Sequence, residues 1–412
     1  MSLLRRNSWR YLLRHPENLD ARMQRSKALL WSGAYSEAER ALEELLRLVP
    51  AGETHERVEL DLARLYRQTA RPLRAVSVVD DVLARSPDNE DAKNEASYGL
   101  ALTKPTLSSR DAMYVDSRKN FILSATESLT VPITHAVSAI GDVGVYRLGS
   151  DHEALEAARS NVGARVLLSS KLNAQLEVLG GPRFYRFFPP SGGINAAFRI
   201  APTGYFRGEA TYGYDDAYYE LAQSATVASG IHVHTFALTP ELRLGSRVSL
   251  AARGVARLAV PENPELEGGA TLMVALGKSF SVGYTGQWLA WKYNDLSYWT
   301  PQGYIAHQAV LRSSGDSEKL GLLYDVLLLA GIAGERVDGL PDPKVGPAWG
   351  AGALIGYAPN KRVQLRLKGQ YGQSLRTTAQ DVATGTEGPI VRVYTRGTYY
   401  WVGTSLTATL VF

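Results

Sequence analysis

The feature that most constrains this chain of 412 residues is a change of hydrophobic period near residue 105. Before that point, apolar residues recur with the 3.6-residue period of helices. After it, apolar and polar residues alternate almost to the end, as they do in strands with two different faces. The alternation is clearest over residues 363–371, where odd positions are apolar or small and even positions are polar. The sequence therefore predicts a helical domain over 1–104 and a β-rich domain over 105–412.

Composition excludes several classes of protein. The chain has no cysteine, which rules out disulfides, thiolate metal sites and cysteine nucleophiles. A net charge of +4 is too small to indicate nucleic-acid binding, so no nucleic-acid partner is predicted. No stretch reaches the ~20 apolar residues of a transmembrane helix. Residues 1–16 do not form a secretory signal, so we expect an exported form to be a mature or truncated chain.

The helical part contains a repeat in which each unit ends at a proline. Pro16, Pro50 and Pro87 each end a helical pattern, as expected of a residue that cannot continue a helix. Small residues that let paired helices approach closely lie at roughly matched offsets: Ser26, Ala38, Ala63 and Ala75. The pattern resembles the tetratricopeptide repeat over roughly residues 1–100, and an unrelated array of helical hairpins is the alternative. Such repeats bind a peptide or another protein, so the resemblance implies a docking function.

The predicted strands and their connections indicate a membrane barrel. The strands exceed the ~5–6 residues that are usual in globular sheets and are long enough to cross a membrane at a tilt. Short turns alternate with long polar loops, as in outer-membrane barrels, whereas a soluble sandwich is the alternative. The long loops are predicted at 149–159, 186–193, 215–224, 261–268, 293–303, 336–346 and 374–396.

The last fourteen positions, residues 399–412, form an extended pattern that alternates from residue 402 onward and ends on an aromatic residue. Such an end resembles the signal that the barrel-insertion machinery reads, although an edge strand of a soluble sheet also fits. The residues assigned to this signal are Gly403, Leu406, Ala408, Leu410 and Phe412. If this strand descends to the periplasm, counting strands backwards predicts an even number of about sixteen. The helical repeats then lie in the periplasm.

Two short segments carry a family resemblance. Residues 105–117 and residues 298–304, which read YWTPQGY, are similar to the outer-membrane proteins of synthase-dependent exopolysaccharide export in Gram-negative bacteria. These include the outer-membrane component of cellulose synthase and the poly-N-acetylglucosamine porin. A group known as YaiO-like barrels is also similar. This chain departs from the exporters in having far fewer repeats.

The resemblance implies an α plus transmembrane β fold, with a short repeat domain followed by an outer-membrane β-barrel. It also implies export of a biofilm polysaccharide such as cellulose through a porin-like channel in contact with outer-membrane lipid. The expected partners are periplasmic or inner-membrane synthase components that dock on the helical repeats. The alternative is a plugged barrel that acts as a surface receptor or as a structural anchor for the helical adaptor.

Inward residues of the predicted strands form the candidate polysaccharide path. They are Arg199, Arg207, Glu209, Arg247, Arg253, Arg257, Asp325, Gln364, Arg366 and Lys368. Cations outnumber carboxylates among the inward residues assigned, which include Glu177, so we hypothesise a basic lumen and an acidic glycan. Tyr298, Trp299 and Tyr304 are predicted either to stack on sugars at the exit or to belong to the interfacial aromatic girdle.

Three local patterns mimic chemical sites, and we assign none of them a catalytic function. Residues 277–279 match the end of a phosphate-binding loop but lack its earlier glycine. His232 and His234 share a strand face without an apparent third metal ligand, which favours a lumen-lining or core role. Glu262 and Glu265 are predicted to lie in a solvated loop rather than to form a glycosidase pair. The sequence predicts no enzyme, no cofactor and no metal.

Overall fold

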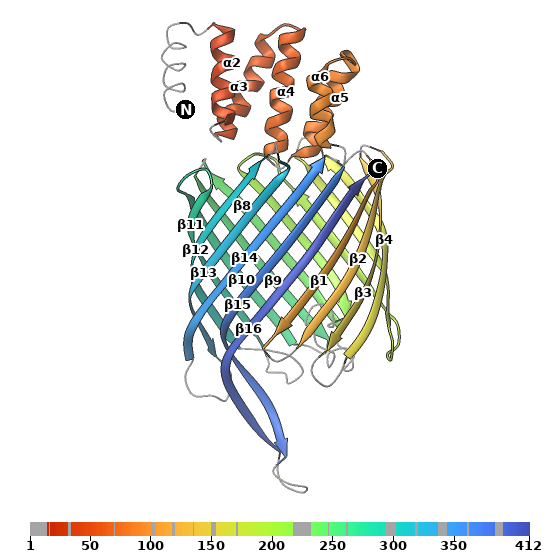
Figure 1. Ribbon diagram of the computed structural model, residues 1–412, viewed down its shortest axis with the longest axis vertical. Coiled ribbons are helices and arrows are strands. Elements are labelled where there is room, and N and C mark those ends of the chain that lie inside the picture. The colour runs from red at the N-terminus through yellow and green to blue at the C-terminus, as the bar shows by residue number, and fades with distance from the viewer. Residues whose placement is uncertain are drawn as a thin grey trace.

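The computed structural model describes residues 15, 17–31, 34–69, 71–99, 104–117, 120–134, 136–149, 154–169, 172–216, 232–245, 247–260, 263–292, 302–317, 320–336, 344–360, 362–383 and 390–412. A layer of helices lies over one end of a closed β-barrel (Figure 1). The helices are α2 (Leu19–Trp31), α3 (Tyr35–Leu48), α4 (Glu53–Gln68), α5 (Pro72–Arg85), α6 (Glu90–Ala96) and the 3-10 turn η1 (Ser97–Gly99). We call this end of the barrel the helical end and the opposite end the loop end.

Sixteen strands form the barrel, and each pairs in antiparallel fashion with its sequence neighbours. They are β1 (Thr106–Asp116), β2 (Phe121–Pro132), β3 (Val137–Gly149), β4 (Ala154–Ser169), β5 (Ala174–Tyr185), β6 (Ser191–Ile200), β7 (Phe206–Asp216), β8 (His232–Leu244), β9 (Val248–Val260), β10 (Asn263–Ala275), β11 (Phe280–Trp291), β12 (Gly303–Ser317), β13 (Leu322–Arg336), β14 (Lys344–Asn360), β15 (Val363–Ala383) and β16 (Ile390–Val411). The predicted fold class and strand number are therefore confirmed.

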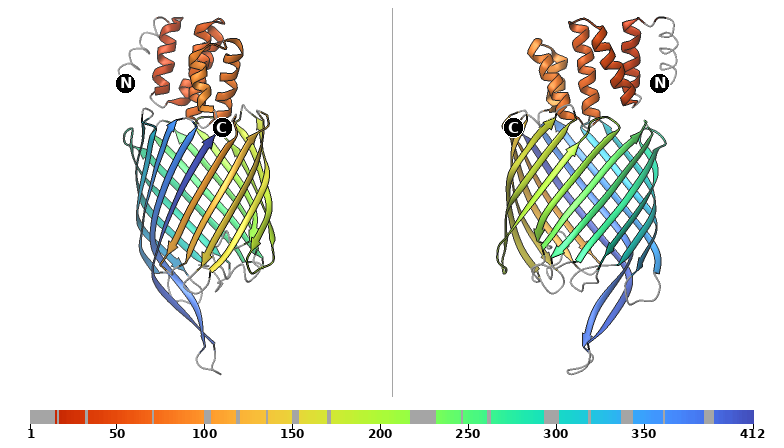
Figure 2. Two further views of the ribbon diagram at one scale, coloured as in Figure 1. Left: turned by 45° about the vertical axis from the view of Figure 1, so that its right-hand side comes forward. Right: turned by 180° about the vertical axis from the view of Figure 1, so that it is seen from behind.

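The barrel closes between its first and last strands. Thr106 pairs with Val411, and the register continues without a break to Asp116 and Trp401. The amide of Phe412 donates a hydrogen bond of 2.9 Å to the carbonyl oxygen of Pro105. Closure satisfies the backbone groups that an open sheet edge would leave unpaired, which is a requirement for any strand inside a lipid bilayer. The chain ends at the helical end, beside the helices that begin it (Figure 2).

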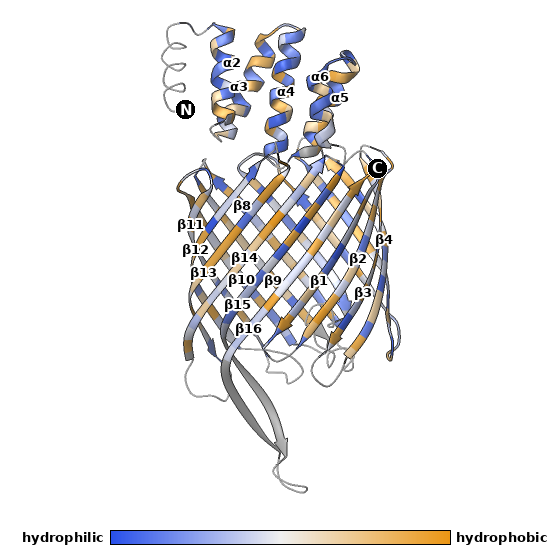
Figure 3. Ribbon diagram, in the orientation of Figure 1, coloured by the Kyte–Doolittle hydropathy of each residue, from blue (hydrophilic) through white to orange (hydrophobic). Residues whose placement is uncertain are grey.

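The two faces of the wall differ because the side-chain period of a strand is two. Outward positions are mostly apolar, and inward positions carry most of the charge. Figure 3 shows the resulting mixture of hydrophobic and hydrophilic residues along the strands. Outward aromatic residues form a belt near each end, as in membrane barrels. The belt at the loop end contains Phe184, Tyr212, Tyr214, Trp288, Trp349 and Tyr371. The belt at the helical end contains Phe206, Phe280, Tyr324, Tyr357 and Phe412.

Several predicted loop boundaries are wrong because the strands run further than expected. The largest error concerns residues 374–396, predicted as one long polar loop. In the structure β15 and β16 continue as a paired hairpin through this segment, with Ala383 opposite Ile390. Figure 1 shows this hairpin projecting beyond the other strands at the loop end. The smaller errors are of the same kind: Arg159 lies within β4, and Glu265 lies within β10.

The helical layer has its own hydrophobic core. The small residues predicted at close helix contacts are buried: Ser26, Ala38, Ala63 and Ala75. Leu42, Leu45 and Val82 fill the space between neighbouring helices and are almost inaccessible to solvent. Among the described residues, no helix is long and apolar enough to span a membrane.

The helical layer contacts the barrel at the turn between β6 and β7. A Cβ atom built on Gly204 would lie 2.9 Å from Cγ2 of Thr69 and 3.4 Å from Cβ of Tyr35, so this turn requires a residue without a side chain. Arg71 is fully buried behind the contact and donates to the Glu39 carboxylate at 2.7 and 2.8 Å. It also donates to Oγ1 of Thr69 at 3.0 Å, which fixes the contacting loop. This interface places Tyr35 at the mouth of the barrel.

Candidate functional site

The interior of the barrel is the candidate site. Two pockets of about 740 and 650 Å³ lie within it and share Asp325, Leu327 and Leu329 of β13. The first opens at the helical end, where Tyr35 of α3 lines it. The second extends across β10 to β15 toward Tyr304. A polar interior that reaches from the helical layer along the strands can accommodate a hydrated solute.

One side of this interior, the inner face of β3 to β13, is an ion-paired wall. Arg199 lies between two carboxylates, with nitrogen–oxygen distances of 2.8 Å to Glu209 and 3.3 Å to Glu177. Arg165 also contacts Glu177, at 2.7 Å. The same pattern repeats around the barrel in the pairs Arg207–Glu241, Arg257–Glu265 and Arg312–Asp325. Most of the charges on this wall are neutralised by a neighbouring strand.

The most buried pair of the ion-paired wall lies on its loop-end half. Arg183 of β5 has no solvent exposure and contacts Oδ2 of Asp215 at 2.7 Å. It also donates to Oδ1 of Asn161 at 2.7 Å, and Asn161 in turn donates to Asp142 at 2.8 Å. This chain of contacts ties β3, β4, β5 and β7 together. Because a buried arginine is stable only when its donors are satisfied, this cluster serves the fold.

The other side, the inner face of β14, β15, β16, β1 and β2, is a cationic wall. Arg366 and Arg110 lie on either side of Thr407, which is the cross-strand partner of both. Lys368 lies opposite Ser405 on the same face. These three cations are exposed, and within the part of the chain that the structure describes none of them forms an ion pair. Their cross-strand partners on β16 are hydroxyl residues, and those of Arg366 and Lys368 on β14 are Gly356 and Leu354, so none of these partners is a carboxylate.

The predicted path residues all lie where their side chains can reach the interior. Arg199, Arg207, Glu209, Arg253 and Arg257 belong to the ion-paired wall, as does Asp325. Arg247 lies in the turn before β9 and lines the pocket at the helical end. Gln364, Arg366 and Lys368 lie on the cationic wall. Their role in transport stays a prediction.

Sequence reasoning missed many charged side chains of the interior. Among the missed cations is Arg110, and the missed carboxylates include Asp142, Asp215, Glu241 and Glu267. The lumen is therefore not basic throughout, because acidic and basic side chains alternate along the ion-paired wall. Cations without an ion-pair partner among the described residues gather on the cationic wall, and Arg247 at the helical end is a further one. The alternation of β8 and β10 is the sequence signal that could have located Glu241 and Glu267.

The structure also places the remaining candidates. Tyr304 lines the interior pocket rather than the outer belt, while Tyr298 and Trp299 lie outside the described residues. His234 faces outward, where its Nδ1 lies 3.1 Å from the Tyr212 hydroxyl, so the predicted lumen-lining or core role is wrong.

Glu265 is almost fully buried on the ion-paired wall, not in a solvated loop, because Arg257 compensates its charge at 2.6 Å. Within the described residues, no group of three potential ligands could hold a metal ion. Leu406, Ala408, Leu410 and Phe412 lie on the outward face of the last strand, and Gly403 lies on its inward face. The function of these residues as an assembly signal stays a prediction.

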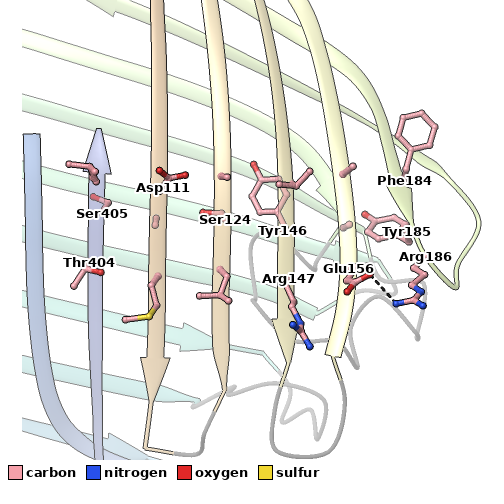
Figure 4. Close-up of a pocket in the computed structure, with 18 of the residues that line it drawn as sticks. Asp111, Ser124, Tyr146, Arg147, Glu156, Phe184, Tyr185, Arg186, Thr404 and Ser405 are labelled. Atoms are coloured by element: carbon pink, nitrogen blue, oxygen red, sulfur yellow. Dashed lines mark hydrogen bonds and ion pairs between the residues drawn. The ribbon is translucent and has the colours of Figure 1, made fainter. Parts of the chain in front are cut away.

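A further pocket, of about 920 Å³, lies on the outer surface of the barrel across β16 and β1 to β5 (Figure 4). Its apolar lining includes the exposed side chains of Met113, Leu123 and Phe184. At its loop-end edge, Arg186 forms an ion pair of 3.1 Å with Glu156. Outward apolar positions on a membrane barrel contact lipid, so this pocket is separate from the interior path.

Geometry and lining together define a closed, sixteen-stranded barrel of the outer-membrane type with a polar interior. A solved structure described as a "Bacterial polysaccharide outer membrane secretin" aligns with a TM-score of 0.56 at 12% identity, over 76% of this chain and 99% of that chain. Pseudomonas aeruginosa OccK11 (OpdR) and OccK3 (OpdO) align with TM-scores of 0.38 and 0.40. They are 10% and 11% identical to this chain, and each match covers 75% of this chain and 96% of the other. No protein-family model matches the chain, and no curated protein matches it.

Proposed function

We propose that this protein is a non-enzymatic channel of the bacterial outer membrane that exports a secreted polysaccharide. The observation that carries the proposal is the polar interior, whose pockets extend along the strands to Tyr35 in the helical layer. A linear glycan is hydrated and rich in hydroxyl groups, so a path lined by charged, amide and hydroxyl side chains suits it. The likeness of the barrel to a polysaccharide secretin supports this choice of cargo.

In this proposal the helical end faces the periplasm, and the helices form tetratricopeptide repeats that dock synthase components. Exposed apolar side chains on this layer, such as Trp31 and Leu48, offer a contact surface for a protein partner. Since Tyr35 lies at the mouth of the barrel, a partner bound to this layer could deliver the growing chain directly to the lumen.

Reconstitution of the full chain tests the channel. In planar bilayers we expect stable single-channel currents, and in liposomes loaded with a fluorescent linear oligosaccharide we expect efflux. Absence of both would identify a plugged barrel that acts as a receptor or anchor. Current without oligosaccharide efflux would identify an ion pore and contradict the glycan cargo.

A further inference from the structure

The cationic wall brings together three cations that have no ion-pair partner among the described residues, whereas elsewhere in the interior such a cation stands alone, as Arg247 does in the turn before β9. Its three cations lie close together, because Arg110 and Arg366 both face Thr407 in the strand between them and Lys368 lies on the same strand face as Arg366. With adjacent strands ~4.8 Å apart, their backbones are separated by about 10 Å. Lys368 follows Arg366 by two positions, about 7 Å along the same strand face. All three side chains can therefore reach one extended ligand.

Hydroxyl groups lie across from these cations on β16 and β2, whereas Leu354 is the partner of Lys368 on β14. Thr407 lies between the two arginines, Ser405 lies opposite Lys368, and Thr126 lies opposite Arg110 on β2. A hydroxyl neighbour can donate to an anion or to a sugar hydroxyl and adds no negative charge. On the other side of Arg366, its partner Gly356 carries no side chain and an apolar leucine of β13 packs over that position, so no acid faces the guanidinium from β14.

The nearest carboxylates do not neutralise this wall. Asp325 of β13 lies across Leu354 from Lys368, two strands away, and is paired with Arg312 at 2.7 Å. Asp116, on the same face of β1, lies six residues from Arg110, about 20 Å along the strand, and accepts a hydrogen bond of 2.9 Å from the Tyr399 hydroxyl. Asp142 of β3 accepts from Asn161 and lies 3.9 Å from Arg159. Each of these acids already has a partner of its own, so none is available to the three cations.

We propose that the cationic wall is a binding track for a polysaccharide that carries carboxylate or sulfate groups. Arg110 and Arg366 would each pair with one acidic group, Lys368 would contact the chain on the same strand, and the hydroxyls would hold neighbouring sugars. Guanidinium groups match the planar geometry of a carboxylate and bind it by charge-assisted hydrogen bonds. The proposal rests on the proposed export function and specifies its cargo as an anionic glycan.

Binding to the detergent-solubilised full chain tests the track without requiring transport. The probes are oligogalacturonate, sulfated dextran oligomers and neutral malto-oligosaccharide, measured by isothermal titration calorimetry at two salt concentrations. We expect the two anionic probes to bind, less tightly at higher salt, and the neutral probe not to bind. Equal binding of the neutral and anionic oligosaccharides would overturn the proposal.

The decisive variant is the triple change Arg110→Gln, Arg366→Gln and Lys368→Gln. It should weaken binding of the anionic oligosaccharides by roughly tenfold or more, because each lost contact is a charge-assisted hydrogen bond. The matched control Arg57→Gln, Arg85→Gln and Lys93→Gln removes the same charge from exposed positions of the helical layer. It should bind like the wild type, and unchanged binding by the lumenal variant would overturn the proposal.

Heat-modifiable gel migration verifies that both triple variants fold, which is expected because the three lumenal cations have no described ion-pair partner to leave uncompensated. The same preparations distinguish the two proposals. If the protein carries no current but binds the anionic oligosaccharides in a charge-dependent way, the export function is contradicted and the binding track is supported. Current without charge-dependent binding retains the channel and contradicts the anionic cargo.

Discussion

The two walls of the lumen use the same residue types for different purposes. On the ion-paired wall, arginines lie directly across from carboxylates, as Arg199 does from Glu209 and Arg257 does from Glu265. On the cationic wall, the positions across from Arg366 and Lys368 on β16 are Thr407 and Ser405. The comparison shows that the cross-strand partner, and not the charged residue itself, decides whether a lumenal cation holds strands together or stays available to a solute.

This difference follows from the energetics of pairing. Cross-strand pairs of opposite charge stabilise neighbouring strands, and their contribution grows where solvent is excluded. A cation flanked by hydroxyls contributes little to strand pairing but keeps its charge for a solute in the lumen. We therefore expect substitutions on the ion-paired wall to change stability, and substitutions on the cationic wall to change binding.

The largest effect should come from Arg183, the buried centre of the ion-paired wall. Arg183→Met leaves Asp215 buried without its main partner, at 8% side-chain exposure, and should lower the free energy of unfolding by about 3–5 kcal/mol. Urea titration followed by heat-modifiable migration measures this loss. The matched change on the cationic wall, Arg366→Met, should cost no more than about 0.5 kcal/mol.

A second variant separates lost charge compensation from lost packing. Arg183→Met with Asp215→Leu removes both charges, and it should recover most of the stability because replacing a buried pair by apolar residues is often neutral. If the double variant is as unstable as the single one, pairing is not the reason for the burial of Arg183.

A smaller effect is expected from backbone packing. Gly181 of β5 approaches β4 so closely that a Cβ atom there would lie 1.9 Å from the carbonyl oxygen of Ser160. Gly181→Ala should therefore cost about 1–3 kcal/mol by overpacking, measured by the same urea titration. Gly352 of β14 is the control on the cationic wall, since the nearest atoms to its Cβ would be 3.9 Å away. Equal losses for the two alanine variants would show that the close approach of Gly181 to β4 is not the cause of the loss.

The sequence predicted those parts of the two walls that depend on local alternation. Arg199 and Arg207 were assigned inward correctly because polar and apolar residues alternate in their strands. The strand number followed from the alternation of short turns with long loops. Arg110 was missed because Asp111 beside it places charges on both faces of β1 and obscures the alternation. The β15–β16 hairpin was taken for a loop because residues 374–396 lack the apolar alternation of a strand that faces lipid.

The ion pairs between neighbouring strands could not be predicted from the sequence, for a different reason. A contact such as that of Arg207 with Glu241 requires the register between β7 and β8, and a shift of one residue would turn one partner outward. The division of the lumen into two walls likewise depends on barrel closure, which makes β15, β16 and β1 neighbours although β1 and β15 are more than 200 residues apart. Charge counts along the chain cannot show this segregation.

The smallest predicted effect concerns a single hydroxyl. Thr407→Val keeps the shape of the side chain between Arg110 and Arg366 and removes its hydrogen-bonding group. One neutral hydrogen bond contributes about 0.5–1.5 kcal/mol, so binding of oligogalacturonate should weaken about two- to tenfold by calorimetry.

The corresponding change on the ion-paired wall is Thr271→Val, which removes a hydroxyl that lies 2.8 Å from that of Thr285. It should leave oligogalacturonate binding unchanged, because the pair lies on the wall whose charges are already compensated. If Thr271→Val weakens binding as much as Thr407→Val, the glycan contacts both walls equally. The distinction between a wall that stabilises the barrel and a wall that binds the solute would then fail for hydroxyl groups, even if it holds for charges.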